Sequence, residues 1–244
     1  FTLEDAYICV NEALKHAGAQ EEVNIEFQWI SSENLEKMDE EKLAEILGSL
    51  SGIVVPQGWG SRGTEGKIKA IKFAREHKIP FLGLCFGMQM AAIEFARNVL
   101  GLNKAHTSEA DQKTPDPVVH IMPHQAEYLA KKQYGGTIRL GAWPMVTQKG
   151  TLLSSIYGGT KTSERHRHRY EFNNKYRKRF EKHGIKFSGL SPDGELVEAI
   201  ELDTKLHPFF LGVQFHPEYK SRPLAPHPIF VEFIKAAGHT ENPK

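Results

Sequence analysis

The chain opens with a stretch in which apolar residues recur every three or four positions, the period of an amphipathic helix. This pattern predicts a helix over Leu3–Ala17 that ends at Gly18. Over Val23–Trp29 apolar residues instead alternate with polar ones, which predicts a strand with one buried face.

Strand-like and helix-like segments then alternate as far as Val99. The predicted order is a helix over Glu40–Leu47, a strand over Gly52–Val55, a helix over Gly66–His77, a strand over Ile79–Leu84 and a helix over Met88–Val99. Short apolar strands separated by helices favour right-handed crossovers. The predicted fold class is therefore α/β, with a mainly parallel central sheet and helices on both of its faces.

Shorter β-like runs follow in the second half, over Ile185–Leu190, Leu196–Leu202 and Phe209–Phe215. Pro192–Gly194 forms a turn signal between the first two, so we expect β-hairpins added to the central sheet. An apolar helix is predicted over Ile229–Ala237.

Two stretches have no regular period. We expect loops over Ala105–Pro117 and Pro123–Gly136, the latter as a mobile lid. The polar residues 239–244 are expected to be disordered. No linker divides residues 1–238, which are predicted to form a single domain.

Composition narrows the class of protein. The 244 residues are 40% hydrophobic, enough for one substantial core, and 31 basic against 30 acidic residues leave a net charge of +1. Such a balance does not favour nucleic acid or a membrane surface, so the expected partner is a small polar molecule. No apolar run approaches the roughly 18 residues that cross a bilayer, and no signal segment is visible, which predicts a soluble, cytoplasmic protein. Because the chain starts at Phe1 and enters a helix pattern at once, we expect it to be part of a longer protein.

Only two cysteines are present, and their contexts differ. Cys9 is predicted to be a buried helix residue. Cys85 is flanked by Gly83 and Gly87 between a predicted strand and a predicted helix, the pattern of a nucleophile elbow. A sharp turn there would lift the central side chain out of the sheet, and only small neighbours would let the backbones pass. The N-terminus of the following helix would favour a thiolate, whereas the alternative is a buried structural cysteine.

A base and a carboxylate follow far downstream, in His216-Pro217-Glu218. In an extended segment residues two apart face the same side, so both side chains can face Cys85, with Glu218 orienting the imidazole. The alternative is a hydrogen-bonded core histidine beside a surface carboxylate.

The loop Gly58–Gly63 fits the glycine spacing of a dinucleotide-binding turn. No acidic residue follows about 20 positions later to bind a ribose, which weakens that interpretation. The competing role is a backbone amide at Gly58 that donates to an oxyanion.

The densest polar cluster is Glu164–Glu171. Its histidines, His166 and His168, could ligate a metal, but no pattern completes a tetrahedral set, and we expect no metal site. A solvated strand, a phosphate-binding patch or an arginine that binds a substrate carboxylate remain open. The basic run Lys175–Lys182 is expected to be the solvated face of a helix.

Cys85, the His216–Glu218 triplet and the loop at Gly58 together resemble the triad-type, class I glutamine amidotransferases. Nearly the whole chain is similar to the glutaminase half of the CTP synthase family. The segments that carry this likeness are Leu3–Tyr7, Glu12–Gly18, Arg62–Lys67, Gly135–Gly141 and Glu164–Glu171. The resemblance implies a flavodoxin-like α/β fold and the hydrolysis of L-glutamine to glutamate and ammonia.

The resemblance also implies roles for residues. Cys85 would be the nucleophile, His216 the general base and acid, and Glu218 its orienting partner. The oxyanion-hole amides would be those of Gly58 and Phe86.

The residues implied for glutamine binding are Gly58, Phe86, Gly87, Met88, Gln89, Glu109 and Arg169. Among them, Glu109 would meet the substrate amino group and Arg169 its α-carboxylate. Two departures from the family pattern are Gln57, where Gly is usual, and the stretch Met122–Tyr134, which does not match the family's lid and leaves the GTP contacts unassigned.

The resemblance further implies that this domain needs no cofactor, whereas ATP, Mg²⁺ and a GTP activator serve the full-length enzyme. The implied partner is the synthase (amidoligase) domain of the same polypeptide, which is absent from this chain and would use the ammonia to aminate UTP to CTP. A homo-oligomeric full-length enzyme is expected. The alternatives are another hydrolase of this fold, such as a γ-glutamyl hydrolase or a cysteine peptidase, and a non-catalytic binding domain.

Overall fold

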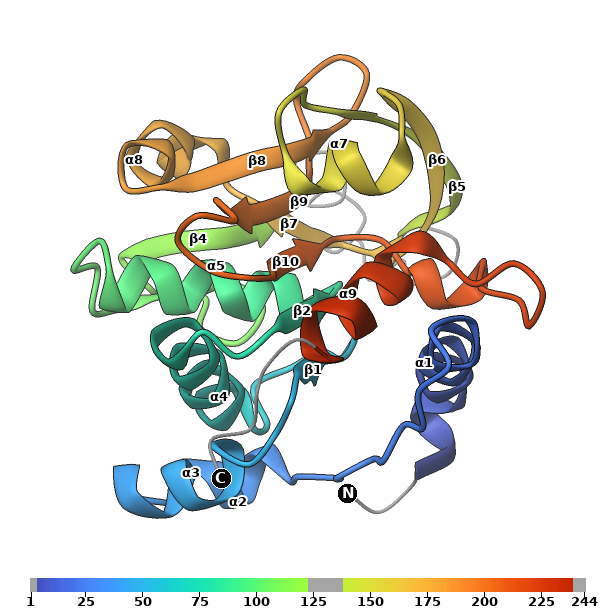
Figure 1. Cartoon of the computed structure of the whole chain (residues 1–244). Helices are drawn as coiled ribbons and strands as arrows, with labels where there is room; N and C mark the ends of the chain where they lie inside the picture. Colours follow the sequence, from blue (N-terminus) through green and yellow to red (C-terminus); the bar gives the residue numbers. More distant parts are fainter. Residues whose placement is uncertain (1–3, 123–137, 239–244) are drawn as a thin grey trace.

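A mixed seven-stranded sheet lies between two layers of helices (Figure 1). The computed structural model describes residues 4–122 and 138–238. The strand order is β1-β2-β10-β9-β8-β5-β6. Within this sheet β2 pairs in parallel with β1 and β10, and the remaining pairs are antiparallel. The predicted α/β class is confirmed. Only the β1-β2 and β2-β10 pairs of this sheet are parallel, so it contains more antiparallel pairs than the helix–strand alternation of the first half indicates.

The first half of the chain supplies the helices that flank the parallel strands. Its elements are η1 (Glu4–Tyr7), α1 (Ile8–Gln20), α2 (Ser32–Glu36), α3 (Glu40–Leu47), β1 (Ile53–Val55), α4 (Thr64–His77), β2 (Phe81–Leu84) and α5 (Phe86–Asn98). The predicted α3 is confirmed at both ends, and Asp39 caps it by accepting from the Lys42 amide at 2.9 Å. Helix α1 does not end at Gly18 as predicted but continues to Gln20. Gly18 instead allows Ile25 to pack closely on the helix, since an added Cβ would stand 2.6 Å from Ile25 Cγ1.

The second half supplies the antiparallel strands and further helices. Its described elements are β3 (Ala105–Thr107), β4 (Asp116–Ile121), β5 (Arg139–Thr147), α7 (Leu152–Tyr157), β6 (Lys161–His168), β7 (Tyr170–Phe172), η2 (Asn174–Tyr176), α8 (Arg177–Lys182), β8 (Ile185–Leu190), β9 (Val197–Leu202), β10 (Phe210–Val213), η3 (Pro217–Tyr219) and α9 (Pro228–Gly238). The three β-like runs and the last helix are confirmed. As expected, α8 exposes most of its basic residues, while Phe180 is buried.

Each face of the sheet has its own core. Phe81 and Phe210 pack with α4, α5 and α8 on one face, whereas Leu82 and Leu211 pack with α1, α7 and α9 on the other. Successive residues of β2 and β10 therefore belong to different cores, as strands covered on both faces require.

Two predictions of local structure are wrong. Val23–Trp29 forms no strand: Ile25, Phe27 and Trp29 are half-buried as their alternation indicates, but the segment has no ladder partner among the described residues. Ala105–Pro117 is not simply a loop, because β3 and the start of β4 lie there, in a separate three-stranded sheet of order β3-β4-β7. In both cases long-range pairing, which local pattern does not report, decides the outcome.

Three further expectations concern particular segments. Cys9 is exposed, so the prediction that it is buried is wrong; it lies on the outward side of α1. The predicted lid over residues 123–136 and the tail 239–244 lie outside the described residues. None of the helices formed by residues 4–122 and 138–238 combines the length and apolarity that a bilayer crossing requires.

Candidate active site

Cys85 occupies the sharp turn between β2 and α5. Its backbone has φ 52° and ψ −99°, in the left-handed half of conformational space that residues with a Cβ rarely adopt. The residue is 5% exposed and stands directly before the first helical residue, Phe86. The predicted elbow geometry is thus present, with the thiol at the N-terminus of a 13-residue helix.

The flanking glycines are required by close backbone approaches. A Cβ on Gly87 would lie 2.0 Å from the carbonyl oxygen of Val55 in β1. A Cβ on Gly83 would lie 2.8 Å from the carbonyl carbon of Gly87. Any larger side chain at either position would push α5 away from the sheet, so the glycines set the depth at which Cys85 sits.

The His-Pro-Glu triplet reaches Cys85 because β10 runs parallel to β2. Val213 is in register with Leu84, and the Cys85 amide donates to the Val213 carbonyl at 2.7 Å. The residues that follow both strands therefore meet at the same edge of the sheet. His216 and Glu218 lie there, 2% and 4% exposed.

His216 Nδ1 lies 2.8 Å from Glu218 Oε1. The two residues are not on an extended segment as predicted: His216 precedes the 3-10 turn η3, and the turn brings the carboxylate back under the ring. The contact through which Glu218 would orient the imidazole is present despite this change in backbone.

The surroundings of His216 favour the charged imidazolium. Burial lowers its pKa, but interactions with Cys85 and Glu218 outweigh burial and raise the pKa to about 10. Its Nε2 atom is buried, and because Nδ1 is bound to Glu218, the interaction with Cys85 is made on the Nε2 side of the ring. The Tyr219 ring stacks on the imidazole at 5.3 Å between centroids and restricts its tilt.

Strand β6 anchors this turn from outside. The His216 amide donates to the Arg165 carbonyl at 2.8 Å, and Lys220 Nζ donates to Glu164 Oε1 at 3.0 Å. Glu164 is fully buried and also accepts from Tyr157 and His227. The backbone next to the triplet is therefore held on two sides.

The polar cluster of β6 is only half solvated, so the simple expectation of a solvated strand is wrong. Its residues alternate, with His166 and His168 buried and Arg165 and Arg167 exposed. His166 Nδ1 lies 3.1 Å from His168 Nε2, and burial with a nearby Arg139 lowers the pKa of His168 to about 3. Both rings are therefore neutral hydrogen-bonding groups.

The Arg139 guanidinium next to these rings makes a bidentate pair with Glu198, at 2.9 and 2.6 Å. Within the part of the chain that the structure describes, no three His, Cys, Asp or Glu side chains come together in a set that would hold a metal ion.

The glycine loop lies over the start of α5. A Cβ on Gly58 would lie 3.4 Å from the Phe86 ring, so the two proposed oxyanion residues are neighbours. Tyr7 OH donates to the Gln57 carbonyl at 3.1 Å and fixes the backbone just before Gly58. The dinucleotide interpretation gains no support from this arrangement, because the Gly60 amide interacts with a carboxylate, Glu109, which would repel a phosphate.

Glu109 and Arg169 lie within electrostatic reach of each other beside this loop. Burial raises the pKa of the Glu109 carboxyl, and the Gly60 N–H, which donates to it, and Arg169 oppose that rise. A carboxylate and a guanidinium near each other beside this loop supply the two charges that would pair with the two ends of a free amino acid.

Met88 and Gln89 are buried on the first turn of α5. A Cβ on Gly212 of β10 would lie 3.0 Å from Met88 Cγ, so this side chain is packed into the sheet. Gln89 Nε2 donates to the Tyr170 carbonyl at 3.0 Å and to Gln214 Oε1 at 3.2 Å. Their side chains thus pack into the sheet and the polar network behind Cys85.

Three further residues belong to this site, although the sequence pattern does not single them out. Gln214 contacts the Cys85 sulfur, Tyr219 stacks on His216, and Tyr7 holds the glycine loop. Gln214 and Tyr219 flank the His-Pro-Glu triplet, and a search of its neighbours would have found them. Tyr7 is 50 residues from its partner, and only the fold reveals that contact.

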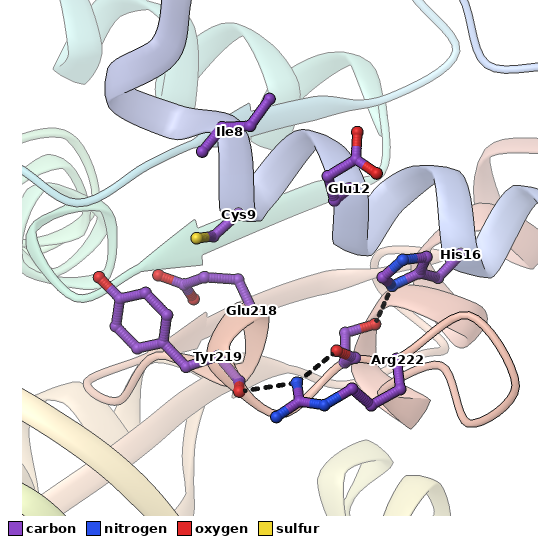
Figure 2. A pocket seen from close by; sticks show the side chains of 8 residues that line it. Ile8, Cys9, Glu12, His16, Glu218, Tyr219 and Arg222 are labelled. Carbon is purple, nitrogen blue, oxygen red and sulfur yellow. Dashed lines mark hydrogen bonds between the residues drawn. The ribbon is translucent and has the colours of Figure 1, made fainter.

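A cavity of about 230 Å³ lies behind Glu218, between α1 and η3 (Figure 2). Cys9, Glu12 and His16 of α1 line one side, and Glu218, Tyr219 and Arg222 line the other. Figure 2 shows the Cys9 sulfur facing the Glu218 and Tyr219 side chains. The second cysteine is thus close to the back of the site, although it belongs to a different surface.

Comparison with known proteins gives a consistent result. The family model described as glutamine amidotransferase class-I matches residues 2–236. A CTP synthase of Geobacillus kaustophilus is 52% identical over 235 residues, 96% of this chain and 43% of that protein. A CTP synthase of Caldanaerobacter subterraneus is 53% identical over 234 residues, 96% of this chain and 42% of that protein. The chain spans less than half the length of these curated relatives.

Solved structures agree with the sequence comparison. The glutaminase domain of Trypanosoma brucei CTPS with bound acivicin has a TM-score of 0.88 and 34% identity, and the match covers 98% of this chain and 90% of that one. A glutamine amidotransferase from Methylobacillus flagellatus has a TM-score of 0.54 at 14% identity, covering 92% of this chain and 89% of that one, and supports the fold alone.

Proposed function

Because this chain belongs to the class-I glutamine amidotransferase family, we propose that it is the glutaminase half of a CTP synthase and hydrolyses L-glutamine to glutamate and ammonia. The observation that carries the proposal is the strained Cys85 turn at the same sheet edge as the buried His216–Glu218 pair. A nucleophile, a base and an orienting carboxylate in this arrangement perform acyl transfer.

In the first half of the reaction, the Cys85 thiolate attacks the side-chain amide carbon of glutamine. The tetrahedral oxyanion accepts hydrogen bonds from the backbone amides of Gly58 and Phe86, which adjoin each other. Imidazolium His216, whose raised pKa keeps it protonated, gives its proton to the departing nitrogen. Ammonia leaves, and a γ-glutamyl thioester remains on Cys85.

In the second half, neutral His216 takes a proton from water, and the resulting hydroxide attacks the thioester carbon. The same oxyanion amides hold the second intermediate. Glutamate leaves as the Cys85 sulfur departs as a thiolate, which restores the ion pair with the imidazolium. Glu218 keeps one tautomer and one orientation of the ring throughout, since its carboxylate binds Nδ1.

Substrate selection follows from the charges beside the loop. We assign Arg169 to the α-carboxylate and Glu109 to the α-ammonium group of glutamine, while the Phe86–Gln89 backbone lines the pocket for its side chain. The position of the Glu109 carboxylate is set by the Gly60 amide that donates to it. A peptide, which lacks one or both of these charges, would leave a half-buried charge without the substrate group proposed to pair with it.

The partner proposed for this domain is the synthase domain of the same polypeptide, which corresponds to the part of the relatives that the chain does not span. Ammonia would pass to that half to aminate UTP in an ATP-dependent step, with Mg²⁺ and a GTP activator serving the full-length protein. No cofactor is assigned to this domain. A cytoplasmic location and a homo-oligomeric full-length enzyme complete the proposal.

The direct test is covalent labelling by an electrophilic glutamine analogue, a diazo-ketone or a chloro-isoxazole, read by intact mass and peptide mapping. We expect one adduct on Cys85 that excess glutamine prevents. The matched control is Cys9→Ser, which replaces the sulfur of the second cysteine by oxygen. This variant should be labelled to the same extent as the parent. Labelling that glutamine does not prevent would favour another hydrolase of this fold, and a Cys85 inert in both this domain and the full-length protein would favour a binding domain.

A further inference from the structure

A second polar group approaches the nucleophile. Gln214, the residue after β10, is fully buried, and its Nε2 lies 3.6 Å from the Cys85 sulfur, within the range of an N–H···S hydrogen bond. Its backbone amide donates to the Glu198 carbonyl at 2.8 Å, so the residue is tied to β9 on its other side.

The direction of this hydrogen bond is fixed by its neighbours. Gln89 Nε2 donates to the backbone carbonyl of Tyr170, which can only accept, so the Gln89 amide cannot be reversed. The same Gln89 NH₂ group donates to Gln214 Oε1, at 3.2 Å. The oxygen of Gln214 must therefore face Gln89, and its NH₂ group must face the sulfur.

An amide donor aimed at sulfur distinguishes the protonation states of cysteine. A thiol sulfur is a weak acceptor, whereas a thiolate carries a full charge and accepts strongly. The donor thus stabilises the thiolate in the free enzyme and fixes where the sulfur stands relative to His216. In a thioester the sulfur again accepts weakly, so the contact favours the starting state and the departure of the thiolate.

We propose that Gln214 is a positioning residue for the nucleophile, which holds Cys85 as a thiolate through an amide chain running from the Tyr170 carbonyl through Gln89. This inference rests on the proposed function for its role in glutamine hydrolysis. The chain also starts next to Arg169, the residue assigned to the substrate carboxylate, so it joins the substrate-binding side of the pocket to the reacting sulfur.

The other groups that act on Cys85 are distinct from this chain. His216 faces it from the end of β10, with Glu218 and Tyr219 of η3 behind the ring. Lys67 of α4 lies over the Phe86 ring, 5.4 Å from its centroid. Gln214→Met removes this amide donor together with the acceptor of the Gln89 NH₂ group, whereas Gln214→Glu removes the donor and keeps the acceptor.

The experiment compares Gln214→Met and Gln214→Glu in a Cys9→Ser background, which leaves Cys85 as the one thiol of the chain. Methionine matches the volume and flexibility of glutamine but donates nothing, and glutamate keeps the acceptor for Gln89 while replacing the donor. Ultraviolet thiolate absorbance and the rate of alkylation by iodoacetamide are measured against pH. We expect the thiolate midpoint to rise by about half to one pH unit in Gln214→Met, and further in Gln214→Glu, because a donor to a charged group is lost or replaced by a carboxylate.

Unchanged midpoints in a variant that folds would overturn the proposal, and the two substitutions protect the test if one of them prevents folding. These readouts do not depend on glutamine. If the Gln214 variants shift the thiolate midpoint but the parent turns over no glutamine, alone or in the full-length protein, the proposed function is refuted and the inference about Gln214 stands. Normal glutamine turnover with an unchanged thiolate midpoint in the Gln214 variants would refute the inference about Gln214 and leave the proposed function standing.

Discussion

The Nδ1 atom of His216 and the Oε1 atom of Glu218 are joined by a 2.8 Å contact formed within one 3-10 turn. Proline between them starts that turn, and the two side chains are buried together. The pair is therefore a preformed unit of the folded chain. It does not need a substrate to assemble it, and its charge state contributes to folding as well as to chemistry.

The first prediction concerns stability against pH. The folded pKa of His216, about 10, lies above the ordinary value of 6.5. The imidazolium therefore contributes its full stabilisation below about pH 6.5, and this contribution is lost as pH rises toward about 10. Chemical denaturation across that window should show the free energy of unfolding falling with pH.

Glu218→Gln should flatten this fall, because the carboxylate that favours the imidazolium is removed. The matched control is Glu45→Gln on the exposed side of α3, which should leave the slope as it is. A slope that Glu218→Gln does not change would mean that the pair contributes nothing to the raised pKa of His216.

The second prediction separates the two cysteines. Cys85→Ala should reduce glutamine hydrolysis at least about 10³-fold, since no thioester can form. Cys9→Ser should retain most of the activity, because serine is close to cysteine in size and the exposed Cys9 side chain lines the cavity behind Glu218 rather than the face toward Cys85. Ammonia release is measured in the full-length protein and in this domain, and substantial turnover by Cys85→Ala would exclude it as the nucleophile.

The third prediction concerns substrate binding. Arg169→Met and Glu109→Gln should raise KM for glutamine more than they lower kcat, because both contacts exist in the ground state and in the transition state. Arg165→Met changes an exposed arginine of β6 and serves as the control. Steady-state kinetics decide the point: a loss confined to kcat would remove these two residues from the binding role.

The fourth prediction tests the close approach of α5 to β1. Gly87→Ala places a methyl group 2.0 Å from the Val55 carbonyl oxygen, so the helix must shift or the domain must unfold. We expect a loss of about 3 kcal/mol or more in the free energy of unfolding. Gly159→Ala meets nothing within 4 Å and should stay within about 0.5 kcal/mol of the parent. Similar stabilities for the two variants would show that α5 tolerates the displacement.

Much of the fold could be predicted because the relevant signals are local. The elbow at Cys85 is encoded by two glycines within two residues of the cysteine, and the structure gives each of them a steric reason. The ends of α3 and β8 follow from apolar periods that tertiary contacts do not override.

The failures share a different cause. Residues 23–29 carry a strand-like alternation, yet they join no ladder of the described chain, because pairing depends on a partner elsewhere in the sequence. The hydrogen bond from Gln214 to Cys85 joins positions 129 residues apart, and no local pattern announces it. The local pattern places His216 and Glu218 on an extended backbone, whereas the turn that brings them together depends on how Pro217 follows β10.

The parallel pairing of β10 with β2 has a consequence for how the domain folds. It closes a loop of more than a hundred residues, and until it forms, the Cys85 sulfur has neither His216 nor Gln214 beside it. Cys9 faces Glu218 and Tyr219 across the cavity, so its surroundings also change when the segment after β10 packs against α1. Pulse alkylation of the Cys9→Ser variant during refolding would therefore report, through the reactivity of Cys85 alone, when the last central strand docks.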